Sequence, residues 1–270
     1  SENYERRFIM TFPNETLPKG RKQKTTALYD RFVNQGAVMG DSFGLENVLW
    51  FANNKEDAHE EPTIKRSRSH DYVSKEVINV RENVGLIEVA NFSKHEFKGP
   101  DARKFLDHIM AGKLPKPGRI SLSPMLSYRG KLCGDLTVAC LDENEFMVFG
   151  SGAAQEMHRR WFESHLDKFN LSYSNRSDEY HGLSIAGPNS RKVLEKIVRD
   201  DVSNEKFKFR DSRRMFVGGV PALVNRISFT GELGYEIYVA PHYQLKLYEE
   251  LVEAGKEFNI KPFGGRALMS

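Results

Sequence analysis

The pattern of apolar and polar positions becomes regular only after residue 71. Residues 1–70 carry no sustained periodicity apart from one helix-like stretch at 25–34, so we interpret them as a connecting arm. Beyond it, Val73, Val77 and Val80 recur at helical spacing, and the apolar run 84–89 predicts a strand. The arm is therefore expected to lead into a compact region.

Later segments alternate between strand and helix signals. Strands are predicted at 136–141 and 146–149 around an acidic turn, at 215–217 and 222–228 around Gly218-Gly219, and at 235–239. Helices are predicted at 153–166 and 242–258, and another begins at the end of the chain. Strands and helices do not alternate strictly, which favours an α+β fold with antiparallel sheets.

One segment occurs twice. Residues 97–109 and 185–197 share a strand, a Gly-Pro turn and a helix whose first residue, Asp101 or Asn189, could cap free backbone N–H groups. Chance is the alternative, because Gly-Pro before a capped helix is common. The agreement of apolar positions favours duplication, and we therefore predict two related α/β modules, 71–175 and 176–270.

Composition narrows the classes of partner. The chain has 40 basic and 37 acidic residues, and the resulting net charge of +3 is too small to favour a nucleic-acid-binding surface. No run of about 18 apolar residues predicts a membrane span. Cys133 and Cys140 do not form a CxxC pair, and the histidines lack ligand spacing, so no metal is predicted.

Two segments carry candidate chemistry. Asp135 stands at the start of an apolar strand, where burial or a nearby cation could shift its pKa, although such residues are usually turn residues. In segment 226–236, two glycines predict a tight turn that carries Glu232 and Glu236. These carboxyl groups could form a site, or they could be ordinary surface acids of a solvated hairpin. Ser151 lies outside any GxSxG elbow, and no GxGxxG follows a strand, so neither a serine nucleophile nor a dinucleotide site is predicted.

Three motifs together carry a family resemblance. Segments 123–138, 226–236 and 264–266 occur in the order and approximate spacing of the glycine cleavage T-protein, an aminomethyltransferase. Segment 27–51 resembles the junction that follows the flavin domain in the dimethylglycine/sarcosine dehydrogenase family. The chain thus resembles the folate-binding half of that family, which implies a T-protein-like fold with two modules around a central site. A flavin domain before residue 1 and a small β-barrel after residue 270 are expected in such proteins, and neither is in this sequence.

The resemblance also implies roles for individual residues. Asp135 would act as the acid/base beside the reactive folate nitrogens, Glu236 would accept hydrogen bonds from the pterin edge, and Arg266 would pair with the carboxylates of the folate tail. Tyr235 and Phe229 would pack against the ring or fill the core. Three further positions are expected to contact the cofactor: Ser151, Leu122 and Met125. Leu122 and Phe229 replace common tyrosines of T-proteins, and Ser151 lies near a common asparagine, so some polar contacts would be lost.

The implied function is tetrahydrofolate-dependent capture of a methylene carbon that a preceding FAD domain releases as an iminium from an N-methyl amine. The partners would be folate, the iminium and the flavin domain, with no nucleic acid and no membrane. Such a protein would be cytoplasmic in bacteria and in the mitochondrial matrix in eukaryotes. A folate-dependent demethylase, a free aminomethyltransferase, or a non-catalytic folate-fold protein used in binding or iron–sulfur assembly are the alternatives.

Overall fold

Three sheets organise the chain. The computed structural model describes residues 2–12, 15 and 17–270. Its five-stranded sheet has the order β5 (Arg119–Leu126), β6 (Leu132–Asp142), β7 (Glu145–Ser151), β4 (Phe92–Lys98), β8 (Ser172–Asn175). Its six-stranded sheet has the order β10 (Ser212–Val217), β11 (Val220–Asn225), β12 (Gly234–Val239), β9 (His181–Ala186), β3 (Val84–Glu88), β13 (Ile260–Pro262). The third is the hairpin β1 (Ala37–Ser42) and β2 (Leu45–Phe51).

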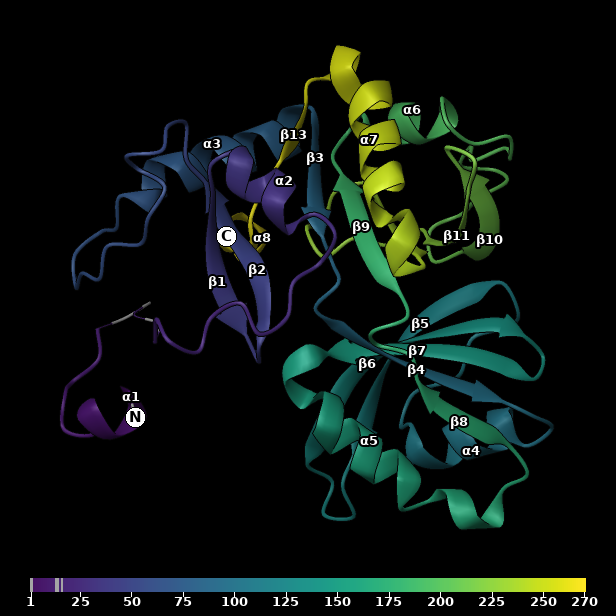
Figure 1. Cartoon of the computed structure of the whole chain (residues 1–270). Helices are drawn as coiled ribbons and strands as arrows, with labels where there is room; N and C mark the ends of the chain where they lie inside the picture. The colour runs from purple at the N-terminus through teal and green to yellow at the C-terminus, as the bar shows by residue number, and fades with distance from the viewer. Residues whose placement is uncertain (1, 13–14, 16) are drawn as a thin grey trace.

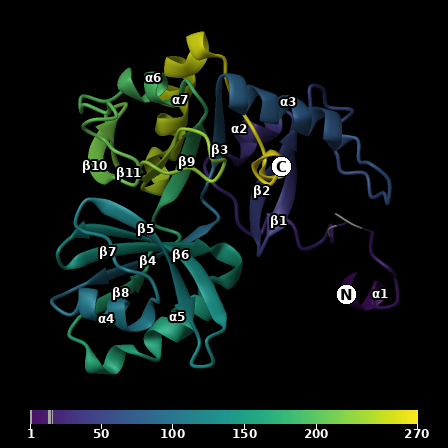
Figure 2. The same ribbon diagram turned by 180° about the vertical axis from the view of Figure 1, so that it is seen from behind.

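Helices cover the outer faces of the two larger sheets (Figure 1). The five-stranded sheet packs against α4 (Ala102–Ile109) and α5 (Gln155–Glu163), and the six-stranded sheet packs against α6 (Ser190–Glu195) and α7 (Gln244–Gly255). The arm adds α1 (Glu2–Glu5) and α2 (Tyr29–Asn34), while α3 (Ser69–Glu82) and α8 (Gly265–Leu268) lie beside β2. Figure 2 shows the same arrangement of helices and sheets from behind.

The two larger sheets meet through a shared apolar layer. Its members include Ile120, Met147 and Phe149 from the five-stranded sheet and Leu223 and Tyr238 from the six-stranded sheet. Strand alternation places these side chains on the inner faces, while the opposite positions fill the separate cores beneath the helices. The predicted α+β fold with antiparallel sheets is confirmed, and β3 and β13 pair in parallel at one edge of the six-stranded sheet.

Both copies of the repeated segment form a strand, a turn and a helix. β4 leads through Gly99 into α4, and β9 leads through Gly187 into α6, one copy in each sheet. Their helix-opening residues do not cap as predicted, because neither side chain accepts a hydrogen bond from its helix backbone. Asp101 instead accepts hydrogen bonds from the Asn170 N–H and Lys104 Nζ, and Asn189 accepts one from Lys192 Nζ.

Most predicted elements are present, although some bounds and one sheet membership differ from the prediction. The 222–228 strand ends at Asn225, so Arg226–Ser228 belong to the loop that follows. β3 lies within predicted module 71–175 but pairs with β9 in the six-stranded sheet, so the sheets do not divide the chain at residue 175. The boundaries 1–70, 71–175 and 176–270 stay a prediction. No helix in the described part of the chain could span a membrane.

Candidate functional site

A cavity of about 580 Å³ opens where β6, β7 and β12 approach one another. It is lined by Ser42, Asn91, Phe92, Leu122, Asp135, Thr137, residues 149–153, residues 227–229 and Glu236. Five predicted site residues are among these: Leu122, Asp135, Ser151, Phe229 and Glu236. The structure therefore brings together residues from both halves of the chain, in a volume typical of small-molecule sites.

Glu236 presents a buried carboxyl group to this cavity. It lies on β12, where alternation points Glu236 and Tyr238 to the same inner face. The Tyr238 hydroxyl donates to Glu236 Oε2 at 2.9 Å, and no residue of the described chain donates to the other oxygen. Burial raises the pKa of Glu236 to about 7, although the Tyr238 hydrogen bond and the charge of Lys94 oppose this shift.

Lys94 is the buried cation near this carboxyl group. Its Nζ donates to the Ala90 carbonyl at 2.8 Å and lies 5.9 Å from the centre of the Tyr238 ring. Burial lowers the pKa of Lys94 to about 7, because water can no longer solvate the ammonium group. When charged, Lys94 favours the ionised form of Glu236.

Asp135 lies on the opposite wall. Asp135 of β6 pairs with Pro124 of β5, and Thr137 pairs with Leu122. Residues two apart in a strand point to the same side, so Asp135 and Thr137 share the face that lines the cavity. The Asp135 side chain is exposed, and it makes no hydrogen bond or ion pair with the residues that the structure describes. Its carboxyl group is therefore open to contact with a bound molecule.

Apolar side chains form much of the remaining wall. Leu122 and Phe229 are each 62% exposed, although their size and chemistry favour burial. Phe149 stacks on Tyr238 with ring centres 4.6 Å apart, and Phe92 extends the same surface. A flat ring bound in the cavity would cover Leu122 and Phe229 and so remove their apolar surfaces from water.

The loop that carries Phe229 is held by its own hydrogen bonds. Ser228 Oγ donates to the Glu232 carbonyl at 2.5 Å, and Thr230 Oγ1 accepts from the Glu232 N–H at 3.3 Å. Gly231 has φ of +77°, which only glycine adopts easily, so the chain turns back into β12 within a few residues. Glu232 contributes no side-chain hydrogen bond to this arrangement and does not line the cavity.

Three predicted site residues lie outside the lining of this cavity, and for Tyr235 this agrees with the core-filling alternative. Tyr235 alternates with Glu236 and points into the core, where its hydroxyl accepts from Arg191 Nε at 3.1 Å. Met125 is fully buried beneath α4 and α5. Arg266 pairs with Glu60 at 2.7 Å and donates to Ser69 Oγ at 2.6 Å, away from the cavity lining.

Sequence reasoning missed other members of the site. Thr137 and Tyr238 each lie two residues after a predicted site residue, so the two-residue strand repeat could have identified them. Asn91, Phe92 and Phe149 come from a turn and two neighbouring strands, and no motif distinguishes them. Among the described residues, no three His, Cys, Asp or Glu side chains could hold a metal ion.

Comparison with known proteins identifies the family. The GCVT N-terminal domain family matches residues 28–270. The chain belongs to this family. Its GCVT domain resembles glycine cleavage system aminomethyltransferase T from Bartonella henselae, with a TM-score of 0.75 and 21% identity over 92% of this chain and 61% of that one. At that identity, the structural likeness supports the fold alone.

Sequence relatives include larger proteins. Mitochondrial dimethylglycine dehydrogenase from Mus musculus is 34% identical over 99% of this chain and 31% of its own length. Sarcosine oxidase subunit alpha from Rhizobium meliloti (strain 1021) is 32% identical over 91% of this chain and 25% of its own length. The chain thus spans about a third or less of these two relatives. This GCVT domain is therefore similar to one part of a dimethylglycine dehydrogenase and of a sarcosine oxidase subunit.

Proposed function

We propose that the cavity binds tetrahydrofolate and catalyses transfer of a methylene unit to it from an N-methyl amine-derived iminium. The observation that carries this proposal is the pairing of two carboxyl groups in one cavity. Glu236 is buried and Asp135 is exposed on the opposite wall. One group is suited to holding a ligand and the other to exchanging a proton.

The residues present suit a pterin-like ring system. The unpartnered oxygen of Glu236 can accept hydrogen bonds from an N–H and amino edge, and Phe149 and Phe229 offer flat apolar surfaces. Burial strengthens a hydrogen bond to a carboxylate because water does not compete for the donors. Ser151 lies in the same lining and offers one hydroxyl group.

Tetrahydrofolate, when bound, supplies the amine nitrogens that take up the one-carbon unit. Asp135 would orient this amine and accept, at a carboxylate oxygen, the proton released as the first nitrogen bonds to the iminium carbon. It would return that proton to the donor amine, which leaves when its bond to the carbon is replaced by one to the second nitrogen. General-base catalysis requires the carboxylate to be unprotonated and within hydrogen-bond reach, and Asp135 has no competing partner among the described residues. We infer no role for Arg266 unless its pair with Glu60 opens.

The iminium would come from a flavin domain of the same enzyme. Support for this context comes from the names of the relatives, a dehydrogenase and an oxidase, and from their greater length. Mitochondrial or bacterial cytoplasmic location follows from the same analogy. The alternative enzymes, a demethylase or free aminomethyltransferase, would use the same cavity and differ in the amine that donates carbon.

Calorimetric titration of tetrahydrofolate into this chain tests the proposal. Glu236→Gln keeps the side-chain shape but replaces an accepting oxygen with an NH₂ group, so we expect binding to weaken by about 10–100-fold. Glu232→Gln, in the neighbouring loop but outside the cavity lining, should stay within about twofold of wild type. Equal affinity of wild type and Glu236→Gln would contradict the pterin role, and a wild-type chain with no affinity would overturn the function.

The pH dependence of this affinity provides a separate prediction. Because burial raises the pKa of Glu236 to about 7, the carboxyl group of the free protein is mostly protonated at pH 6 and mostly ionised at pH 8. Only the ionised form accepts at both oxygens, so affinity should fall about tenfold from pH 8 to pH 6. Calorimetry at both values checks this, and the Glu236→Gln variant should lose the dependence. The same slope in both proteins would assign it to another group.

A further inference from the structure

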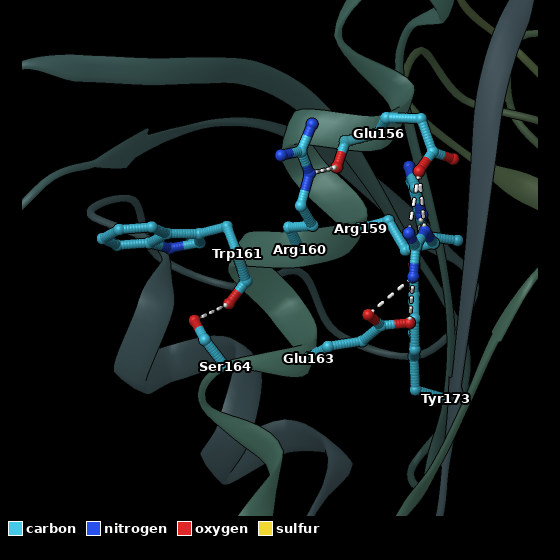
Figure 3. Close-up of polar contacts among 8 residues, drawn as sticks. Glu156, Arg159, Arg160, Trp161, Glu163, Ser164 and Tyr173 are labelled. Carbon is cyan, nitrogen blue, oxygen red and sulfur yellow. Dashed lines mark hydrogen bonds and ion pairs between the residues drawn. The ribbon is translucent and has the colours of Figure 1, made fainter.

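His158 lies against the strands that form the cavity wall. It belongs to α5, whose outer face carries Arg159 bonded to Glu156 at 2.8 Å and to Glu163 at 2.7 Å (Figure 3). His158 is on the opposite, buried face of this helix, with 2% of its surface exposed. The imidazole thus points from α5 toward the sheet.

Two glycines provide the space for the ring. A methyl group added to Gly134 would lie 2.7 Å from His158 Nε2, and one added to Gly150 would lie 3.1 Å from Nδ1. Both distances are shorter than ordinary van der Waals contact, so only glycine admits the imidazole at this depth. Gly134 precedes Asp135, and Gly150 lines the cavity. The ring therefore packs against the backbone that supports the site.

The strand under Asp135 is irregular at this point. Gly134 pairs with Met125 and Leu132 with Leu126, so Cys133 is an extra residue without a partner on β5. On the other side, β7 pairs with β6 only from Thr137 onward. Bulges of this kind redirect neighbouring side chains and often occur beside active sites. Cys133 thus has no partner on either neighbouring strand, whereas Gly134 and Asp135 stay paired with β5.

His158 provides the missing partner. Its Nε2 lies 3.2 Å from the Cys133 carbonyl oxygen, and because a carbonyl only accepts, Nε2 must carry the proton. Burial lowers the pKa of His158, so the ring is neutral and Nδ1 is unprotonated. Nδ1 is buried without a partner among the described residues, which leaves the bond to Cys133 as the ring's single hydrogen bond.

We propose that His158 is a positioning residue for Asp135: its Nε2–H holds the bulged carbonyl of Cys133 and thereby fixes where the Asp135 carboxylate meets the bound ligand. This inference rests on the proposed function. It assigns His158 no contact with the ligand and no exchange of protons. Its effect is on the geometry of proton transfer, where a displacement of about 1 Å can lower a rate by about 100-fold.

A matched pair of variants tests this role. His158→Gln retains an N–H donor near the position of Nε2, whereas His158→Met has similar length and no donor. Without the donor, we expect hydrogen exchange at the amides of residues 133–135 to accelerate by about tenfold or more and kcat for one-carbon transfer to fall by about tenfold or more. Tetrahydrofolate affinity should stay within about threefold, because Glu236 is unchanged. His158→Gln should recover most of both properties.

Three results discriminate between the outcomes. If the two variants have equal exchange and equal kcat, or if nitrogen NMR of the wild-type chain shows the proton on Nδ1 of His158, the positioning role is wrong. The NMR measurement needs no variant and so does not depend on how well the variants fold. A wild-type chain that fails to bind tetrahydrofolate would instead overturn the proposed function and this role with it, whatever the exchange data show.

Discussion

Asp135→Asn is expected to slow one-carbon transfer to tetrahydrofolate by about 10²–10⁴-fold, the usual contribution of a positioned general base. The amide has the same shape but cannot accept the proton released by the reacting amine. The assay would supply the iminium chemically, from formaldehyde and a secondary amine, and would subtract the rate without protein. The chain's own cavity would then be measured apart from any flavin reaction.

Thr137→Val is the matched control for Asp135→Asn. Thr137 lies two residues further along β6, lines the same wall and carries no group that takes up a proton at neutral pH. We expect its rate to stay within about threefold of wild type. If Asp135→Asn retains the wild-type rate while still binding folate, Asp135 is not the base, and the cavity would act by binding alone, as in the non-catalytic alternative.

The central strands were predictable from sequence because both of their faces are buried in apolar layers. β6 and β7 carry apolar residues on both faces, one face toward the helices and the other toward the second sheet, so they appear as apolar runs around an acidic turn. Sheet membership was not predictable in the same way. β3 follows the arm in sequence but pairs with β9 almost 100 residues later, and nothing in its own residues specifies that partner.

Membership of a motif did not by itself decide which side chains line the cavity. Asp135 and Glu236 were found by resemblance, and both line the cavity. For Tyr235 the resemblance left open packing on the ring or filling the core, and because adjacent residues in a strand face opposite sides, Tyr235 fills the core while Glu236 lines the cavity. Arg266 was assigned to the folate tail from its motif alone, and the sequence gives no sign that Glu60 would bind it first.

The role of His158 illustrates what local patterns omit. Most of β6 and all of β7 separate it from Cys133 in sequence, and His158 belongs to no spaced motif. Its position depends on α5 packing across the sheet and on glycines at 134 and 150, which the sequence shows but does not connect. Contacts of this kind follow from tertiary packing, so single-sequence reasoning cannot identify them.

Gly187→Ala is expected to lower the free energy of unfolding by about 3 kcal/mol or more, because the alanine would suffer both backbone strain and a clash. Gly187 has φ of +127°, and an added methyl group would lie 2.4 Å from the Val80 carbonyl oxygen and 2.7 Å from that of Asn83. Both atoms belong to backbone at the end of α3 and cannot rotate away as a side chain could. Urea unfolding of the variant chain, followed by circular dichroism, measures the loss.

Gly219→Ala separates the two contributions. Gly219 has φ of +79° in the β10–β11 turn, but an added methyl group would meet no atom within 4 Å, so strain alone should cost about 1–2 kcal/mol. Equal losses in the two variants would mean that the close approach at Gly187 is easily relieved. A larger loss at Gly187 would show that this copy of the Gly-Pro turn is needed for α3 to pack on the sheet. The Gly187 N–H also donates to the Leu233 carbonyl at 2.8 Å, so the same turn contacts the loop that carries Phe229.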